Sequence, residues 1–158
     1  MAFDLVLSNT YNQFDLLNLD LSLNNLMDLS ILNGNNFIIQ EVQKILFTIQ
    51  GSYFFDSNYG STIREFIGDK IFNPSDIENS IAQSIQDSIT NLILNQSKIP
   101  FLTMDETIQG IQLIQVSYDA ETNITNNQNS VMTFDVLIQL IVGTNIVSVN
   151  NVIMIKGA

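Results

Sequence analysis

Residues 40–68 read QEVQKILFTIQGSYFFDSNYGSTIREFIG, and no other stretch gathers so many unusual residues. It predicts a helix that ends at Gly51, then an aromatic loop, then a short helix over residues 62–67. Gly60 precedes the short helix and is expected to supply an unusual backbone angle or to allow a close approach. The short helix carries Arg64, the only arginine. We interpret this stretch as a shaped surface rather than as core.

Two amphipathic helices are predicted on either side of the aromatic loop. The first begins at Phe37 with Asn36 as its N-cap, and the second spans residues 74–96 with proline in its first turn. Ser75 and Glu78 have the spacing of a capping box. Apolar residues recur along one face of each helix, which predicts that this face is buried. The predicted stripes are Phe37, Ile38, Val42, Ile45, Leu46 and Ile49, and Ile77, Ile81, Ala82, Ile85, Ile89, Leu92, Ile93 and Leu94.

Three strands are expected near the C-terminus, over residues 107–118, 131–142 and 146–156. Gly143 begins a tight turn before the last strand, in which Asn150–Asn151 predicts a bulge or kink. This order predicts an α+β fold, with two to three helices packed on one face of a mainly antiparallel sheet and a C-terminal strand meander. In the middle strand every second residue is apolar and should face the core. This set is Met132, Phe134, Val136, Ile138, Leu140 and Val142.

Residues 1–36 are rich in Leu, Asn and Asp and are predicted to form an extended N-terminal segment. From Leu17 to Leu23, leucine alternates with polar residues, which favours a half-buried strand. Such a segment either adds strands to its own sheet or pairs with another chain, and the sequence leaves both open. Residues 37–158 are expected to form a single α+β domain, because a chain of this length can bury one core.

The composition narrows the possible functions. The chain has 158 residues, a net charge of −11, 13% charged residues and 46% hydrophobic residues. A surface so poor in charge suits burial against partner proteins. The acidity argues against nucleic-acid binding, which needs a basic face. The N-terminus lacks the basic region of a signal peptide, and no apolar run reaches the ~20 residues that cross a bilayer.

The sequence offers little support for catalysis or metal binding. It contains no cysteine and no histidine, which excludes disulfides, zinc sites built on those residues and Ser-His-Asp triads. Paired carboxylates are the remaining route to catalysis, as in glycosidases. No pattern supports a pair among the candidates, so we expect no enzyme activity, no cofactor and no metal. The candidate carboxylates are Asp56, Glu65, Asp69, Asp105 and Glu106.

Residues 46–68 resemble the baseplate wedge proteins of contractile phage tails. This sheath-initiator family includes the lysozyme-like baseplate domain of T-even-type phages and has relatives in type VI secretion and pyocin-like particles. Its pattern is a helix ending in L-x-T-x-x-G-E, followed after a few residues by Y-G-S/T-x-L/I. The resemblance covers residues 26–118 well and the ends loosely. The residues that match the pattern are Leu46, Thr48, Gly51, Tyr59, Gly60, Ser61 and Ile63.

The chain departs from the family pattern in two places. Ser52 stands where the family usually has Glu after the first glycine. A Glu-Pro-Arg turn often follows the long helix of the family, whereas residues 96–98 read Gln-Ser-Lys here. Lys98 keeps a positive charge but the carboxylate is missing. The contact of that turn with neighbouring wedge subunits is therefore called into question.

The resemblance implies a structural protein of the virion, located in the phage tail baseplate and made in the host cytoplasm. It implies six copies around the tail tube or hub, joined to baseplate wedge proteins, that start the tail sheath protein assembling by strand addition. Neither nucleic acid nor membrane is expected as a partner. The alternative is a tail-associated peptidoglycan hydrolase, because members are often labelled lysozyme-like. That activity would depend on Glu65.

Two surfaces are predicted to bind the partners. One is the aromatic loop with its nearby cations, which would fill a contact and anchor an acidic chain. The other is the last strand, which is apolar and almost uncharged, as an edge awaiting a partner would be. The alternative for the second surface is that the last strand is an ordinary internal strand of the sheet. The predicted partner-binding residues are Tyr53, Phe54, Phe55, Tyr59, Gly60, Arg64, Lys98, Ile146, Val147, Val149, Val152, Ile153 and Ile155.

Overall fold

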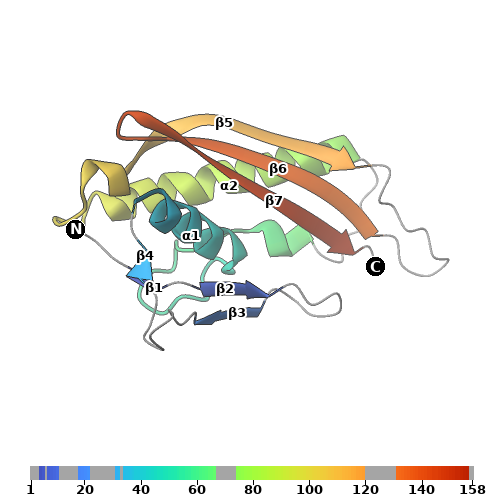
Figure 1. The fold of residues 1–158 in the computed structure, drawn as a ribbon. Helices are drawn as coiled ribbons and strands as arrows, with labels where there is room; N and C mark the ends of the chain where they lie inside the picture. Colours follow the sequence, from blue (N-terminus) through green and yellow to red (C-terminus); the bar gives the residue numbers. More distant parts are fainter. Residues whose placement is uncertain are drawn as a thin grey trace.

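A three-stranded antiparallel sheet with the order β5-β6-β7 organises the fold (Figure 1). Its strands are β5 (Ile108–Asp119), β6 (Val131–Val142) and β7 (Asn145–Lys156). A two-residue turn joins β6 to β7, and its first residue, Gly143, has the positive φ of 57° that tight hairpins favour. The computed structural model describes residues 4–5, 7–10, 18–21, 31–32, 34–66, 74–119 and 131–156.

The alternating sequence of β6, the middle strand, determines which face of the sheet is buried. Successive side chains of a strand point to opposite faces, so the apolar set predicted for the core shares one face. The structure confirms this prediction, because Met132 packs against the core and the rest of the set is buried. The register continues the same face into both neighbours, since Ile138 pairs with Ile114 of β5 and with Val149 of β7. The buried members are Phe134, Val136, Ile138, Leu140 and Val142.

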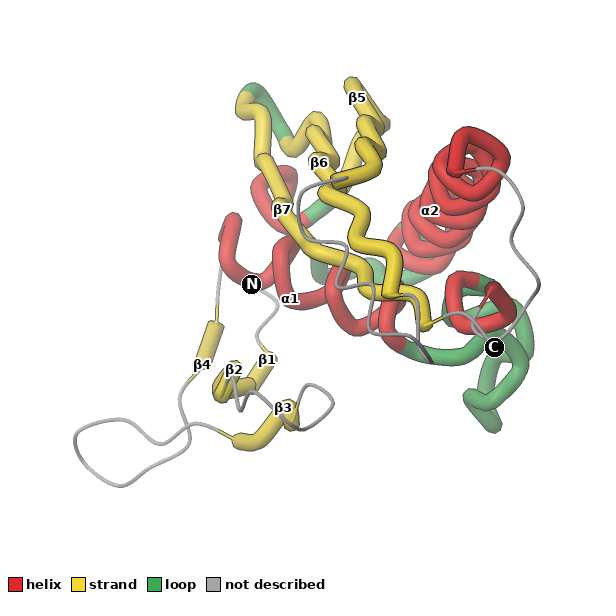
Figure 2. Tube along the Cα trace, turned by 90° about the vertical axis from the view of Figure 1, so that its right-hand side faces the viewer, coloured by secondary structure: helices red, strands yellow, loops and turns green. Residues whose placement is uncertain are grey.

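Two helices cover the buried face of the sheet. α1 (Gly34–Phe47) contacts β7 and α2 (Pro74–Gln96) contacts β5, and Figure 1 and Figure 2 show both helices along that face. The predicted α+β fold, with helices on one face of an antiparallel sheet and a C-terminal meander, is confirmed. Fully burying each large apolar side chain contributes about 1.5–3 kcal/mol to folding. The buried stripe residues are Phe37, Ile38, Val42, Ile45 and Leu46 in α1, and Ile77, Ile81, Ile85, Ile89 and Leu92 in α2.

The helix ends differ from the sequence prediction. α1 begins at Gly34 rather than Phe37, so Asn36 lies inside the helix and is not its N-cap. Ile49 lies beyond the end of α1, and Leu94 lies on the last turn of α2. Both side chains are largely exposed, so neither belongs to the buried stripe that was predicted for it. Ile49 follows the end of α1, whereas Leu94 lies two residues, or roughly 200° around the helix, from the buried Leu92 and therefore points away from the sheet.

The predicted capping box of α2 is wrong, although its predicted first residue is correct. Ser75 is the second residue of the helix and so does not occupy the N-cap position. Glu78 instead bonds to the sheet, where its Oε1 accepts the backbone N–H of Tyr118 at 2.7 Å. A carboxylate near the start of α2 therefore fastens the helix to the end of β5.

The predicted bulge at Asn150–Asn151 is also wrong. Residues 145–156 of β7 pair with β6 in one unbroken register. The register shifts occur in β5, between Ile108 and Gly110 and between Ile111 and Leu113. Asn150 lies on the exposed face of β7, where a polar side chain does not disturb the ladder.

The described parts of residues 1–32 form short strands, whereas residues 34–36, which were predicted to be extended, belong to α1. β1 (Asp4–Leu5) pairs with β4 (Ile31–Leu32), and β2 (Leu7–Thr10) pairs with β3 (Asn18–Leu21). Both pairs are antiparallel and separate from the β5-β6-β7 sheet. Most of the alternation predicted from Leu17 to Leu23 therefore falls on β3, and its two ends lie outside the described residues.

The chain after α1 is closed into a loop by backbone contacts at Gly60. Ile49 and Ser61 form a parallel bridge, in which Gln50 N donates to Ser61 O at 3.0 Å and Ser61 N donates to Thr48 O at 2.8 Å. Gly60 has a φ of 114°, and a Cβ built on it would lie 2.7 Å from both Gln50 N and Thr48 O. Only glycine permits this approach. We call the contact of residues 48–50 with residues 60–62 the Gly60 closure.

Buried hydroxyl groups of α2 hold the Gly60 closure against the core. Ser84 Oγ accepts hydrogen bonds from Thr62 N at 3.1 Å and from Thr62 Oγ1 at 2.8 Å. Ser88 Oγ donates to Gly60 O at 3.1 Å. The 3₁₀ helix η1 (Ile63–Phe66) follows directly, in place of the short helix predicted there. The remainder of that predicted helix lies outside the described residues.

The variant Gly60→Ala is expected to lower the free energy of unfolding by about 3 kcal/mol, because its methyl group meets backbone atoms and the positive φ is strained. Urea unfolding followed by circular dichroism measures this loss. The matched control is Gly51→Ala, where φ is 80° but the nearest atom is 4.0 Å away. Only backbone strain, about 1–2 kcal/mol, is expected there. Equal losses in the two variants would contradict a steric role for Gly60.

Candidate functional site

Residues 52–59, the aromatic loop, present three aromatic side chains to solvent. Phe54 is 92% exposed, Phe55 is 84% exposed and Tyr53 is 47% exposed. The rings contact one another, with centroid distances of 5.8 Å for Tyr53–Phe55 and 5.3 Å for Phe54–Phe55. Tyr53 also lies 5.1 Å from Tyr59. Contiguous exposed apolar side chains of this size mark interaction sites on protein surfaces.

Asp56 fixes the shape of the aromatic loop. Its Oδ1 accepts the backbone N–H of Asn58 at 2.9 Å, which closes a local turn, and its Oδ2 accepts Asn95 Nδ2 of α2 at 2.7 Å. These two hydrogen bonds hold the pKa of Asp56 below its ordinary value of 3.8, and the bond from Asn58 has the larger effect. Lys98 adds a smaller effect in the same direction. The loop is therefore tied to α2 whenever Asp56 is ionised.

The other residues predicted for this surface divide into supporting and exposed positions. Tyr59 packs against the core and Gly60 is buried in the closure, so both shape the loop from behind. Arg64 on η1 is exposed, and no acid within the described ranges forms a salt bridge with it. Lys98 is exposed and donates from Nζ to Asn95 Oδ1 at 2.9 Å, which brings it to the same α2 side chain that holds Asp56.

The side chains of β7 fall into two sets. Ile146 and Val152 are exposed on the face of the sheet that no described helix covers. The other predicted residues of this strand belong to the core, so a partner cannot contact their side chains without opening the fold. The sequence prediction treated both sets alike because every one of these residues is apolar. The buried set is Val147, Val149, Ile153 and Ile155.

β7 is an edge strand, and its turn determines which backbone groups point outward. In a two-residue hairpin the residues that flank the turn, here Val142 and Asn145, exchange backbone hydrogen bonds. Hydrogen-bonded pairs then alternate along an antiparallel ladder. The odd-numbered residues of β7 therefore bond to β6, and the even-numbered residues point N–H and C=O toward the open edge. No described strand pairs with that edge. Its outward residues are Ile146, Ser148, Asn150, Val152, Met154 and Lys156.

Side chains of α2 engage the opposite edge of the sheet at its two ends. The same alternation leaves the N–H groups of Ile108 and Tyr118 pointing away from β6. Each donates to a side chain of α2, Ile108 to Gln96 Oε1 at 2.9 Å and Tyr118 to Glu78 Oε1 at 2.7 Å. The sheet therefore has one edge that side chains of its own helix engage at both ends, and one edge without such bonds in the described part of the chain.

Sequence reasoning missed part of the exposed surface. Ser148, Asn150 and Met154 lie on the open face of β7, and only the fixed hairpin register could have identified them. A second exposed apolar group follows α2, where Ile99, Phe101 and Met104 are at least half exposed. These residues belong to no periodic apolar stripe. Their position in a turn region was the only sequence feature that could have indicated their exposure.

The candidate carboxylates do not share one environment. Glu65 is exposed on η1, and Asp56 is engaged in the loop as described above. Glu106 is buried in η2 (Met104–Glu106), where its Oε2 accepts Thr103 N and Thr103 Oγ1. Asp69 lies outside the described residues. Among the described residues no group of acids could hold a metal ion, and no helix is long and apolar enough to cross a membrane.

The variant Asn95→Ala is expected to raise the pKa of Asp56 toward 3.8, because the carboxylate loses its hydrogen bond from α2. In the native chain, Asp56 stabilises the fold above pH 3.8, and that contribution is lost as the pH falls through its lower folded pKa. An NMR titration of the side-chain carboxyl measures the pKa of Asp56 in the native chain and in the variant. Asn91→Ala is the control, since Asn91 Nδ2 reaches only Asn58 O, at 3.4 Å. An unchanged pKa in Asn95→Ala would contradict this anchoring role.

Comparison with known proteins gives no family for the chain. No protein-family model matches it, and no curated protein sequence matches it. The resemblance to baseplate proteins therefore rests on the sequence pattern within residues 46–63.

Proposed function

We propose that this chain is a structural subunit of a contractile phage tail baseplate, which joins wedge subunits around the tube and starts sheath assembly by accepting a strand. The observation that carries the proposal is the difference between the two edges of the sheet. α2 side chains occupy outward backbone groups at both ends of β5, whereas the outward groups of β7 have no described partner. An edge of this kind is a template for pairing with another chain.

Most of the features that usually protect a sheet edge are missing from β7, whose one charged residue is Lys156 at its last position. Natural proteins blunt such edges with lysine, proline, bulges or very short strands. Residues 145–155 contain neither proline nor a charged residue, and the strand has unbroken register. At twelve residues β7 is also long for a strand, since lengths of about 5–6 are most common. These properties favour a strand that pairs with a partner in the assembled particle.

The proposal of a baseplate role draws on the family pattern. Thr48, Gly60 and Ser61 match the pattern, and all three build the Gly60 closure. The pattern therefore corresponds to a structural unit whose consequence is an ordered aromatic loop. The loop and Arg64 offer a second surface, made of side chains rather than backbone, which suits contact with a wedge protein. Two different surfaces fit a subunit that joins two kinds of partner.

The variant Ser148→Pro is expected to abolish strand addition without unfolding the chain. Ser148 is exposed and its N–H points to the open edge, so proline removes an outward donor and leaves the β6–β7 ladder intact. Sheath assembly on the chain, followed by electron microscopy with the sheath protein of the same particle, measures the effect. Folding is checked by circular dichroism.

Two controls separate an edge effect from a folding effect. Ser148→Ala keeps the backbone donor and should assemble normally. Val149→Pro removes a ladder hydrogen bond and a core side chain, so it should unfold the protein. Normal sheath assembly by Ser148→Pro would refute strand addition at β7. Deleting β7 is a poorer test, because the deletion also removes four buried core residues, Val147, Val149, Ile153 and Ile155.

The variants Phe54→Ala and Arg64→Ala are each expected to weaken docking to the wedge protein by about tenfold or more, as hot-spot truncations do. Both side chains are exposed, so the free energy of unfolding should change by less than about 0.5 kcal/mol. Co-sedimentation with the wedge protein measures docking, and urea unfolding measures stability. The exposed Glu65→Gln serves as the neighbouring control. Loss of fold in Arg64→Ala would show that Arg64 is structural instead.

A further inference from the structure

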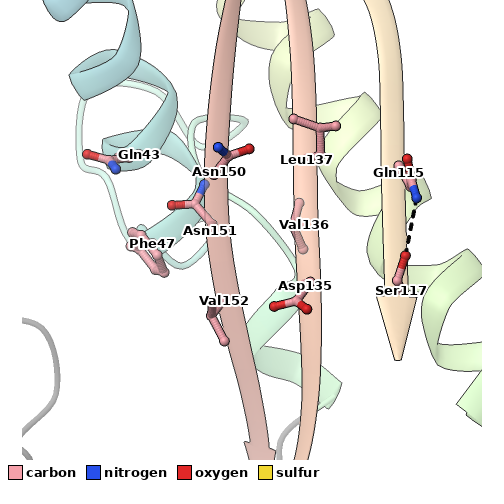
Figure 3. A pocket seen from close by; sticks show the side chains of 10 residues that line it. All are labelled: Gln43, Phe47, Gln115, Ser117, Asp135, Val136, Leu137, Asn150, Asn151 and Val152. Atoms are coloured by element: carbon pink, nitrogen blue, oxygen red, sulfur yellow. Dashed lines mark hydrogen bonds between the residues drawn. The ribbon is translucent and has the colours of Figure 1, made fainter. Parts of the chain in front are cut away.

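A buried amide without a hydrogen-bond partner lies at the open edge of β7. Asn151 Nδ2 is buried and makes no hydrogen bond among the described residues. The side chain extends from β7 toward α1, beside Gln43 and Phe47 (Figure 3). A buried donor without a partner costs about 1–3 kcal/mol, so a group that supplied an acceptor here would recover that free energy on binding.

Asn151 is part of a depression that crosses the edge of the sheet. The depression has a volume of about 430 Å³ and extends from α1 past β7 onto the exposed face of the sheet (Figure 3). Among the described residues Asp135 is the only charged one that lines it, and none of their cations forms a salt bridge with Asp135. The chain as a whole has a net charge of −11. The complementary charge is therefore positive. The remaining lining residues are Gln115, Ser117, Val136, Leu137, Asn150 and Val152.

The register of β7 determines where an added strand would place its side chains. The backbone of Asn151 bonds to β6, so in an antiparallel added strand the residue opposite Asn151 would form a non-hydrogen-bonded pair, in which side chains approach most closely. That residue would point toward α1, as Asn151 does. Its neighbour opposite Val152 would lie on the exposed face, and Asp135 of β6 pairs with Val152 from the other side.

The distance across Val152 suits a long basic side chain. Strands lie about 4.8 Å apart, so the backbone of the added strand would be roughly 10 Å from that of β6 at Asp135. A Lys or Arg side chain can cover most of this distance while its aliphatic part lies over Val152. Asp135 and Val152 are both exposed, so nothing in the described structure stands between them and such a side chain.

We infer that the strand accepted by β7 carries two adjacent recognition residues, a neutral hydrogen-bond acceptor opposite Asn151 and a Lys or Arg opposite Val152. The acceptor is the amide or hydroxyl group of Asn, Gln, Ser or Thr, because a carboxylate would add to an acidic surface. The inference rests on the proposed addition of a strand at β7. It deepens that proposal by naming the side chains that select the partner.

Capped, fluorescent peptides of about ten residues test the inference with the full chain. The reference peptide alternates Thr and Val and carries Lys-Asn at its centre. Replacing the central Asn by Leu should weaken binding about tenfold or more, and replacing the Lys by Glu should weaken it about threefold. A peptide with proline at its centre, which cannot continue the ladder, should not bind. Fluorescence anisotropy measures the affinities.

Two variants of the chain assign each preference to its residue. In Asn151→Val the preference for Asn over Leu should disappear, and in Asp135→Lys the Glu peptide should bind more tightly than the Lys peptide. Circular dichroism checks that both variants are folded. Equal affinity for the Lys-Asn, Lys-Leu and Glu-Asn peptides would overturn this inference and leave strand addition standing. Absence of binding by every peptide, or binding unaffected by proline or by Ser148→Pro, would overturn strand addition and this inference with it.

Discussion

The close approach of Gly60 to the chain after α1 is the contact on which the rest of the surface depends. With no side chain at residue 60, the backbone from Thr48 to Gln50 can bond directly to Ser61. The hydroxyl groups of Ser84 and Ser88 then fasten this closure to the buried side of α2. Both ends of the aromatic loop are thereby fixed by backbone hydrogen bonds. The rings of Phe54 and Phe55 can remain exposed because their order does not depend on burying them.

The two edges of the sheet differ in how far the helices engage them. α2 packs along β5, and its side chains reach the outward N–H groups at the two ends of that strand. α1 is shorter and packs beneath β7 without supplying comparable bonds to its outer edge. An apolar strand with unpaired backbone groups is a liability in a free protein. In an assembly it becomes an attachment site whose affinity comes mainly from main-chain hydrogen bonds.

Local patterns predicted those parts of the fold that depend on local chemistry. The alternation of β6 gave its buried face, and Pro74 gave the first residue of α2, because side-chain period and proline geometry act within a few residues. The errors arose where a distant residue decides the outcome. Glu78 bonds to Tyr118 forty positions away instead of capping its own helix. A sequence pattern cannot show such a contact.

The candidate site was predicted less completely than the fold, for the same reason. The exposed rings of Phe54 and Phe55 were identified from composition, because no amphipathic period included them. The residues of β7 could not be divided between core and edge until the Gly143 turn fixed the hairpin register. The anchoring of Asp56 required Asn95, which is distant in sequence and carries no signal of its own.

The two proposed surfaces differ in how they can discriminate between partners. The aromatic loop offers rings held in place before binding, so docking would lose little conformational entropy, and selectivity can come from shape. A strand edge offers backbone groups that every sequence shares, so pairing alone selects poorly. Specificity at the edge must come from side chains beside the ladder. Asn151 and Asp135 are placed to provide it, one through an unsatisfied donor and one through a charge with no salt bridge in the described structure. Because an unsatisfied buried donor outweighs an exposed charge, Asn151 should contribute more to this selection than Asp135.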